Sequence, residues 1–281
     1  MKTIVTHHMP DLDAISSVWL LKRFMPGWDK AQVAFVPAGS TLGEDVVDSD
    51  PSILHVDTGL GQLDHHQTDE DTCAAKRTLE YIVDYELRTK NQKLKDEALE
   101  RLVEIVNDID HFRDAYYPNP AADFYDFSLV GQLDGWKLLF PDDNQKLVDL
   151  GMVALDGIYK KLQDKVWASR EIEEKGVDFT TKWGKALGIE TVNDEVVRLG
   201  QKMGYVLVVR KDPNKDYARI KALPNSKADL ESAYKKLKKL DASATWYLHV
   251  SHKMLLNGSM KNPKTKPTKL TLREIIDVLK I

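Results

Sequence analysis

The chain has 281 residues, of which 42% are hydrophobic and 30% charged, and its formal net charge is −4 at pH 7. This composition predicts a soluble globular protein and argues against one that coats nucleic acid broadly, although a locally basic groove is allowed. No run approaches the roughly 18 apolar residues of a membrane helix, and the first residues do not read as a signal peptide. The single cysteine, Cys73, excludes an intramolecular disulfide. We therefore expect a cytoplasmic protein with no membrane partner.

The first predicted strand, residues 2–6, ends in a polar turn. A helix is expected at residues 14–24, where apolar side chains recur at helical spacing. Asp11 or Asp13 alone is typical of a helix start, because the helix dipole favours negative charge there. Together with His7, however, they form a cluster of candidate metal ligands in a strand-to-helix turn.

Two further apolar runs, residues 32–37 and 53–56, predict the second and third strands. The third strand ends at Asp57, and a glycine-containing loop then leads to Asp64, His65 and His66. Because open α/β sheets bind ligands at the carboxyl ends of parallel strands, the two polar clusters are expected to meet there. Carboxylate oxygens and imidazole nitrogens suit divalent cations. The order of elements predicts an α/β fold, a parallel sheet with helices on both faces.

Three groups of residues occur in the order and spacing of a known family. They are His7 with Pro10, Asp11 and Asp13, then Asp57 after an apolar strand, and then Asp64, His65, His66 and Gln67. This pattern resembles motifs I to III of the DHH phosphoesterase superfamily, and the Asp-His-His-Gln form resembles its Myg-type exonuclease branch. The motifs cover only the first quarter of the chain. Family II inorganic pyrophosphatases, RecJ-like exonucleases, nanoRNases and cyclic-dinucleotide phosphodiesterases share them, so the resemblance indicates the chemistry better than the substrate.

The resemblance implies a fourth acidic motif after the Asp-His-His loop. A strong helical pattern at residues 95–111 supplies two candidates. Asp110 is the preferred ligand because it lies on the apolar stripe that includes Val106, where an acid is costly unless it is paired or binds a cation. Asp108 is the second choice. The alternative is that both acids simply end the helix beside Arg113.

The resemblance also implies a role for each side chain of a centre with two divalent ions. One ion would bind His7 and Asp11, the other would bind Asp13 and His65, and both would be bridged by Asp57 and Asp110. Mixed imidazole and carboxylate ligands favour Mn²⁺, with Mg²⁺ and Co²⁺ as alternatives. His66 would contact the phosphate or donate a proton to the leaving oxygen, and Asp64 would fix the tautomer of a histidine by accepting its N–H.

A change of composition near Gly176 predicts a second domain. The expected domains are residues 1–175, a DHH-type phosphoesterase domain, and residues 176–281, a smaller α+β domain that binds substrate. Further helices of the first domain are expected at residues 72–88, 124–139 and 146–175. The second domain is expected to contain a hairpin, a helix, a strand and a final helix capped by Thr271, at residues 204–222, 228–240, 245–250 and 272–279.

Polar side chains gather after the last predicted strand of the second domain. We expect a substrate phosphate to be bound there, with a contribution from the hairpin, by His249, Ser251, His252, Lys253 and Arg210. DHH-associated domains bind substrate through a basic or Gly-rich motif of this sort. The chain lacks the Gly-Gly-Gly-His form of RecJ-like members and the Ser-Arg-Lys-Lys-Gln signature of family II pyrophosphatases. Several lysines follow, from Lys261 onward, and could add positive charge to this site. The alternative is that they belong to a solvated loop with no role in binding.

The expected activity is hydrolysis of a phosphodiester or phosphoanhydride, and three functions compete. A Mn²⁺-dependent nuclease or oligonucleotide phosphodiesterase is favoured by the Myg-like motif and the basic C-terminal stretch. A small-molecule phosphatase or pyrophosphatase would need a compact pocket with several Lys or Arg side chains. A non-enzymatic nucleotide-binding regulator would be expected to have lost a ligand, and none of the first three motifs has lost one. The expected partner is a nucleotide or a short nucleic acid, and the oligomeric state is left open.

Overall fold

The computed structural model describes residues 1–90, 95–259 and 262–280, so that Lys261 of the predicted basic run lies outside the described residues. The chain forms two compact units, Met1–Leu162 and Gln163–Ile281. The limit between them falls within the long helix α5 (Asn144–Lys175). The domain boundary expected after residue 175 stays a prediction. Among the described residues, no helix has both the length and the apolar character that a bilayer crossing demands.

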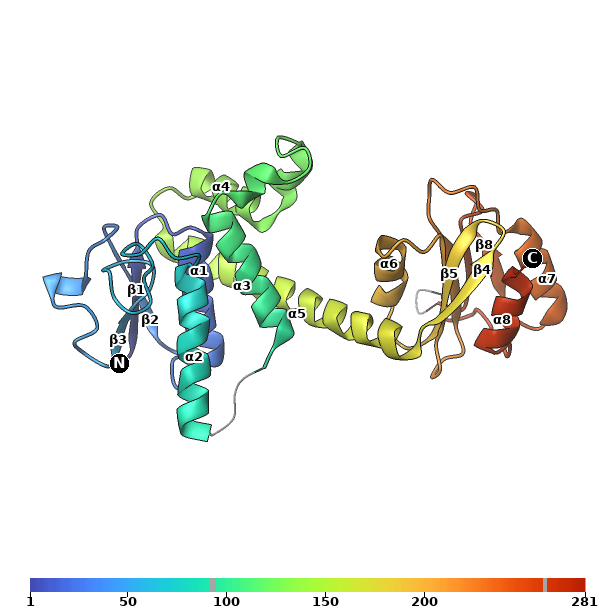
Figure 1. Ribbon diagram of the computed structural model, residues 1–281, viewed down its shortest axis with the longest axis horizontal. Coiled ribbons are helices and arrows are strands. Elements are labelled where there is room, and N and C mark those ends of the chain that lie inside the picture. Colours follow the sequence, from blue (N-terminus) through green and yellow to red (C-terminus); the bar gives the residue numbers. More distant parts are fainter. Residues whose placement is uncertain (91–94, 260–261, 281) are drawn as a thin grey trace. The chain divides into compact units, whose positions relative to one another are not determined.

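The first unit is built on a three-stranded parallel sheet (Figure 1). Strand β1 (Thr3–His7) lies at its centre, between β2 (Gln32–Val36) and β3 (Ile53–His55). Thr3 pairs with the first residue of each neighbouring strand, so the carboxyl ends of the strands lie at the same edge. This parallel sheet with its helices confirms the predicted α/β class.

The helices of the first unit, including three short 3₁₀ helices labelled η, are α1 (Leu12–Phe24), η1 (Leu42–Glu44), α2 (Ala74–Lys90), α3 (Glu97–Asp110), η2 (Arg113–Tyr116), η3 (Asp123–Phe127) and α4 (Leu129–Leu139), followed by the start of α5. Helix α1 is buried from Leu12 to Leu21 because it packs against both α2 and α3. Its indole at Trp19 is fully buried and donates a hydrogen bond to Asp156 of α5 at 2.8 Å. This core fixes the start of α1 at the edge of the sheet.

The prediction of one helix over residues 124–139 is wrong, because the chain forms η3 and then α4. Ser128 separates the two, and its hydroxyl accepts the N–H of Gly131 to cap α4. A Cβ atom at Gly131 would lie 2.5 Å from the backbone of Asp126, so only glycine allows this close approach of the two turns. The helices predicted at residues 72–88, 95–111 and 146–175 are confirmed within a few residues as α2, α3 and α5.

The second unit contains a six-stranded sheet in the order β4-β5-β6-β7-β9-β8, in which only β5 and β6 are parallel neighbours. Its strands are β4 (Val177–Thr181), β5 (Gly184–Glu190), β6 (Leu207–Lys211), β7 (Ala218–Ala222), β8 (Trp246–Leu248) and β9 (Met254–Asn257). Its further helices are α6 (Glu195–Lys202), α7 (Glu231–Leu240) and α8 (Leu272–Leu279), and the expected cap of α8, Thr271, is confirmed. The predicted hairpin corresponds to β6 and β7.

Three strands of the second unit, β4, β5 and β9, were not predicted from the sequence. Strand β5 contains two glycines, which are poor strand formers. One of them, Gly188, lets α8 pack closely, because a Cβ atom there would lie 2.5 Å from the side chain of Ile276. Strand β9 follows a polar turn, and its buried Asn257 donates to the carbonyls of Thr245 and Lys266. Tertiary packing therefore stabilises strands whose local sequence gives little signal.

Candidate metal centre

Six polar side chains meet at the carboxyl edge of the parallel sheet in the first unit. They come from the end of β1, the start of α1, the loop after β3 and the end of α3, and they are His7, Asp11, Asp13, Asp57, His65 and Asp110. These are the six residues predicted as metal ligands, so the structure brings the whole set together. That they bind a metal stays a prediction.

The start of α1 holds two of the carboxylates. Asp11 is the N-cap of α1, and its side chain accepts the N–H of Ala14 at 3.0 Å. Asp13, only 2% exposed, accepts the N–H groups of Ala74 and Ala75 at 2.7 Å each, at the start of α2. Because the N-terminal end of α2 faces Asp13, its carboxylate can be buried without losing hydrogen-bond donors.

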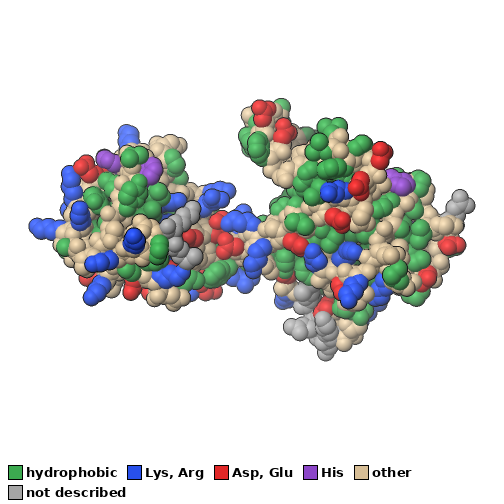
Figure 2. All heavy atoms as spheres, turned by 180° about the vertical axis from the view of Figure 1, so that it is seen from behind, with side chains coloured by type: hydrophobic (Ala, Val, Ile, Leu, Met, Phe, Trp, Pro, Cys, Tyr) green, Lys and Arg blue, Asp and Glu red, His purple; other side chains and the backbone are tan. Residues whose placement is uncertain are grey.

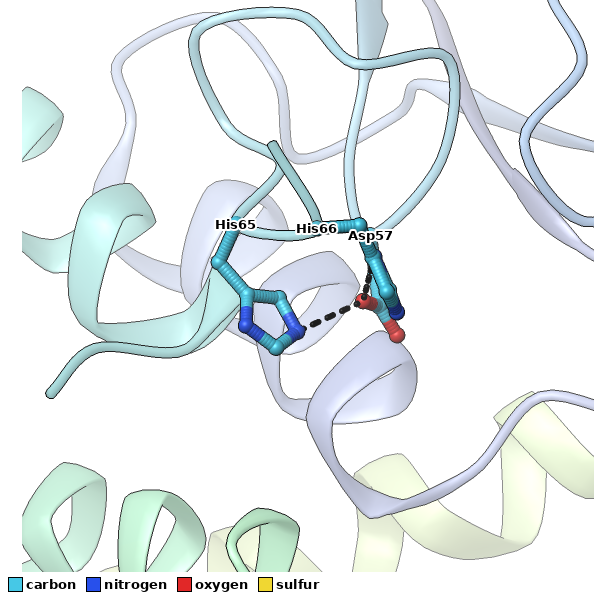
Figure 3. Close-up of side chains that lie close together, drawn as sticks. All are labelled: Asp57, His65 and His66. Atoms are coloured by element: carbon cyan, nitrogen blue, oxygen red, sulfur yellow. Dashed lines mark ion pairs between the residues drawn. The ribbon is translucent and has the colours of Figure 1, made fainter. Parts of the chain in front are cut away.

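The loop after β3 is organised around the fully buried Asp64. Its carboxylate accepts the N–H groups of Leu60, His65 and His66 at 2.7, 2.7 and 3.2 Å. It also lies 2.7 Å from Nδ1 of His66, which fixes the orientation of that ring. Asp57 stands at the start of this loop with a left-handed backbone (φ 54°), a conformation that Asp tolerates better than most residues. The same loop thus presents Asp57, His65 and His66 together (Figure 3).

The six side chains form two groups that share Asp57. In the first group, Nε2 of His7 lies 3.2 Å from Oδ2 of Asp57 and 3.9 Å from Oδ2 of Asp11. In the second, Nε2 of His65 lies 3.7 Å from Oδ2 of Asp13 and 3.6 Å from Oδ2 of Asp110. Oδ1 of Asp57 lies 3.5 Å from Nε2 of His65 (Figure 3). Its two oxygens therefore face the two groups.

The two acids at the end of α3 occupy different surroundings. Asp110 groups with Asp13 and His65, and it also borders the cavity lined by His7, Asp11 and Asp57, so the bridging position expected for it stays a prediction. Asp108 pairs with Arg113 instead, at 3.0 Å. The geometry therefore favours Asp110 over Asp108 as the ligand from α3.

Hydrogen bonds outside the centre leave specific atoms directed into it. Nδ1 of His7 lies 2.8 Å from the carbonyl oxygen of His8, which leaves Nε2 facing Asp57 and Asp11. Nε2 of His65 and Oδ1 of Asp57 are buried and have no hydrogen-bond partner in the described part of the chain, since 3.5 Å is long for a hydrogen bond. A cation between these atoms would satisfy both, so the residues present fit a divalent ion.

The electrostatics of the centre fit a cation as well. Burial, together with repulsion from Asp57 and Asp110, raises the pKa of Asp13 well above its usual range, and burial also raises the pKa of Asp110. The Asp57 carboxylate raises the pKa of His65 to about 9. Burial opposes a similar rise for His7, but Asp57 and the carbonyl of His8 still raise its pKa to about 9. Carboxylates crowded in this way repel one another, and a divalent ion would relieve that repulsion.

Two cavities open beside the six side chains. One, of about 340 Å³, is lined by His7, Asp57 and His66 among others. The other, of about 450 Å³, reaches Asp13, His65 and Asp110, and its remaining wall includes Phe112 and Lys137. The sequence interpretation missed Phe112 and Lys137. Phe112 could have been suspected from its position two residues after Asp110. Lys137 could not, because it lies on α4, which reaches the cavity only through tertiary packing.

The region that contains this centre matches a known protein family. Residues 4–162 match the family described as ChrB, C-terminal domain, and this match spans more than half of the chain. The chain belongs to the ChrB C-terminal domain family. The ChrB match contains all six side chains of the centre and ends at the limit of the first unit. No curated protein matches the sequence.

Solved structures similar to the chain include DHH proteins. RecJ from Thermus thermophilus, in complex with Mg²⁺, is 12% identical with a TM-score of 0.33, and the similarity covers 99% of this chain and 49% of that one. The DHH domain of a protein assigned to a family of ribosomal proteins is also 12% identical, with a TM-score of 0.31 and coverage of 99% and 85%. The chain thus spans about half the length of RecJ. The Myg-type branch stays a prediction.

Four of the predicted substrate-binding residues lie in the second unit, beyond the ChrB match, on the turn between β8 and β9. Nδ1 of His249 lies 2.8 Å from Oγ of Ser251, and Nδ1 of His252 lies 3.2 Å from Oδ1 of Asp229. The ammonium of Lys253 donates to the backbone carbonyls of residues 226 and 228, at 2.7 and 2.5 Å. Lys253 therefore holds a neighbouring loop in place.

Arg210, the fifth predicted substrate-binding residue, lies away from this turn, in β6 of the second unit. Its buried guanidinium pairs with Asp194 at 2.8 Å and with Asp212 at 3.3 Å. It lines a cavity of about 510 Å³ together with Arg219 and Gly258. Since Gly258 follows β9 and Lys253 precedes it, this cavity lies at the other end of that strand. The structure therefore separates Arg210 from the turn with which the sequence grouped it.

Proposed function

We propose that this protein is a metal-dependent phosphoesterase that hydrolyses a phosphodiester in a nucleotide or a short oligonucleotide. The observation that carries the proposal is the position of Asp57, whose two carboxylate oxygens face His7 and His65, one in each group of candidate ligands. A carboxylate shared in this way is what a pair of divalent ions requires. The cavities beside it leave room for a substrate.

His7 and Asp11 are proposed to hold one ion and Asp13 and His65 the other, with Asp57 and Asp110 shared between them. Mn²⁺ is the proposed ion because imidazole and carboxylate ligands are mixed, and Mg²⁺ and Co²⁺ are the alternatives. Bound there, such a pair would lower the pKa of a water molecule and stabilise negative charge on the phosphate. The protein itself holds the ligand atoms in place through the helix starts and through Asp64.

His66 is the proposed contact to the reacting group. Its side chain is 58% exposed, and its Nδ1 lies 3.7 Å from Asp57 and 2.7 Å from Asp64. Since Asp64 holds the ring through Nδ1, Nε2 is the atom that would contact the phosphate or donate a proton to the leaving oxygen. Asp64 acts in this scheme by positioning His66 and the loop.

Within the second unit, we propose that Arg210 contacts a phosphate of the substrate. Guanidinium groups bind phosphate well, and Arg210 and Arg219 line the same cavity, where both pair with Asp194 and a phosphate would compete with that carboxylate. His249, Ser251 and His252 remain secondary candidates. The contacts of Lys253 with two backbone carbonyls make it the weakest of the set. A cytoplasmic location, expected from the single cysteine, remains part of the proposal.

The test is an assay of the purified protein with Mn²⁺ on short RNA, short DNA, cyclic dinucleotides and pyrophosphate. We expect hydrolysis of at least one phosphodiester and its loss in the Asp57→Ala variant. If pyrophosphate were the one compound of this set to be hydrolysed, the pyrophosphatase alternative would be favoured. Binding of a nucleotide without any hydrolysis would favour the regulator.

A further inference from the structure

The larger cavity beside the centre is lined by both polar and apolar side chains. This space of about 450 Å³ is bordered by Asp13, His65 and Asp110, and also by Val106 and Ile109 of α3 and Val130 and Leu133 of α4. Its size is within the range of small-molecule sites, which are mostly apolar with a few convergent polar groups. A substrate seated here would therefore place a charged group at the centre and an uncharged group against the helices.

Phe112, in the lining of this cavity, contributes little to the core of the first unit. Several hydrophobic side chains reach the surface of the first unit, as Figure 2 shows for one face, and Phe112 is 79% exposed. An exposed ring contributes little apolar burial to stability. Its backbone is left-handed, with φ 53° and ψ 25°, a conformation that a bulky residue adopts less readily than Gly or Asn. Such outliers occur at functional sites, and Phe112 stands two residues after Asp110.

Lys137 of α4 supplies a positive charge to the same cavity. The structure gives Lys137 no ion pair with any described residue, so its ammonium can interact with an anionic ligand. An aromatic ring and a cation thus border one space that also reaches the candidate ligands. Stacking on aromatic rings and contact with positive charge are the two elements of binding to single-stranded nucleic acid.

We propose that Phe112 is a specificity residue, which stacks on a nucleobase next to the phosphate held at the centre. This inference rests on the proposed phosphoesterase function and narrows its substrate to base-bearing compounds. Pyrophosphate and simple sugar phosphates have no flat group for the ring, so they would gain nothing from it. The stack would act on substrate binding and would leave the bond-breaking step to the centre.

The test compares two compounds with the same scissile phosphate, a 5′-phosphorylated ribodinucleotide and an analogue that lacks both bases. The variant Phe112→Asn removes the ring and suits the left-handed backbone, so we expect a thermal midpoint at least equal to that of the wild type. For the ribodinucleotide, KM should rise between about 5-fold and about 150-fold at nearly constant kcat, as expected for one lost base–aromatic stack. For the analogue, KM should not change, and Phe112→Tyr should restore the wild-type KM.

Phe127→Asn is the matched control. Phe127 is 84% exposed and belongs to η3, outside the lining of the cavity, so its loss should change neither KM. The role of Phe112 would be overturned, but not the phosphoesterase function, if Phe112→Asn and the wild type had equal KM values on each compound. The same holds if Phe112→Asn raised KM equally for both compounds. Hydrolysis of the analogue by the wild type tests the phosphoesterase separately. A wild type that cleaves neither compound but hydrolyses another phosphodiester would refute this inference alone, and one that hydrolyses no phosphodiester would refute the proposed function with it.

Discussion

Among the described residues, both units contain ligating atoms close enough together to hold a metal ion, and one group from each unit can be compared in burial. Asp13, His65 and Asp110 form one in the first unit, and Asp229, Glu231 and His252 form the other in the second unit. The side chain of His65 is 14% exposed, whereas that of Asp229 is 59% exposed. Burial raises the pKa of Asp13, but the N–H of Glu231 lowers the pKa of the exposed Asp229.

This comparison shows that spacing alone does not define a metal centre. Water can solvate the exposed carboxylates of the second cluster, so nothing there calls for a cation. In the first cluster the carboxylates are largely buried and repel one another, and two buried polar atoms of the centre have no hydrogen-bond partner in the described chain. The two clusters should therefore respond differently to the same substitutions.

The largest expected difference is in activity. Asp57→Ala removes the carboxylate shared by the two groups, so Mn²⁺-dependent hydrolysis should fall by at least about 100-fold, more than the loss of an outer-shell residue costs. Asp229→Ala, the matched change in the exposed cluster, should keep wild-type kcat. Initial rates at saturating Mn²⁺ measure both. An active Asp57→Ala protein would remove the basis for a two-metal centre.

A large effect on stability is expected at Asp64. Replacing it with Ala leaves three N–H groups of the loop without their buried acceptor, which should lower the free energy of unfolding by about 2–4 kcal/mol. Asp229→Ala removes one exposed acceptor, that of the Glu231 N–H, and should lower it by only about 0.5–1 kcal/mol. Urea unfolding monitored by circular dichroism gives both values. Equal stabilities would mean that Asp64 does not organise the loop.

A smaller effect is expected from Asp110. Asp110→Asn removes one charged ligand from the buried cluster and should weaken Mn²⁺ binding by about 10-fold to 100-fold. Asp108→Asn is the control, since Asp108 pairs with Arg113 outside the cluster. Isothermal titration with Mn²⁺ measures both affinities. If Asp108→Asn were the weaker binder, the assignment of the fourth ligand would have to be reversed.

The smallest effect is expected at Lys253. Its ammonium donates to two backbone carbonyls, so Lys253→Met should lower the free energy of unfolding by about 1 kcal/mol. It should leave the KM for a phosphodiester unchanged, whereas Arg210→Met should raise it. A rise in KM for Lys253→Met with unchanged stability would restore the substrate role expected from the sequence.

The sequence by itself determined the α/β class and the six side chains of the candidate centre. Each side chain lies at the end of a strand, in the loop after one, or at the start or end of a helix, and parallel strands bring their carboxyl ends to one edge whatever the rest of the fold. The sequence also favoured Asp110 over Asp108, because the helical period places Asp110 on the apolar stripe.

Only the tertiary structure decided which other residues border that edge. Lys137 and Phe112 reach the cavity because α4 and the turn after α3 pack beside it, and no local pattern records such packing. Likewise, β5 forms around Gly188 because α8 packs against it, and Arg210 is separated from Lys253 by the length of β9. Local patterns determine where a strand or helix ends, but long-range packing determines what lies next to that end.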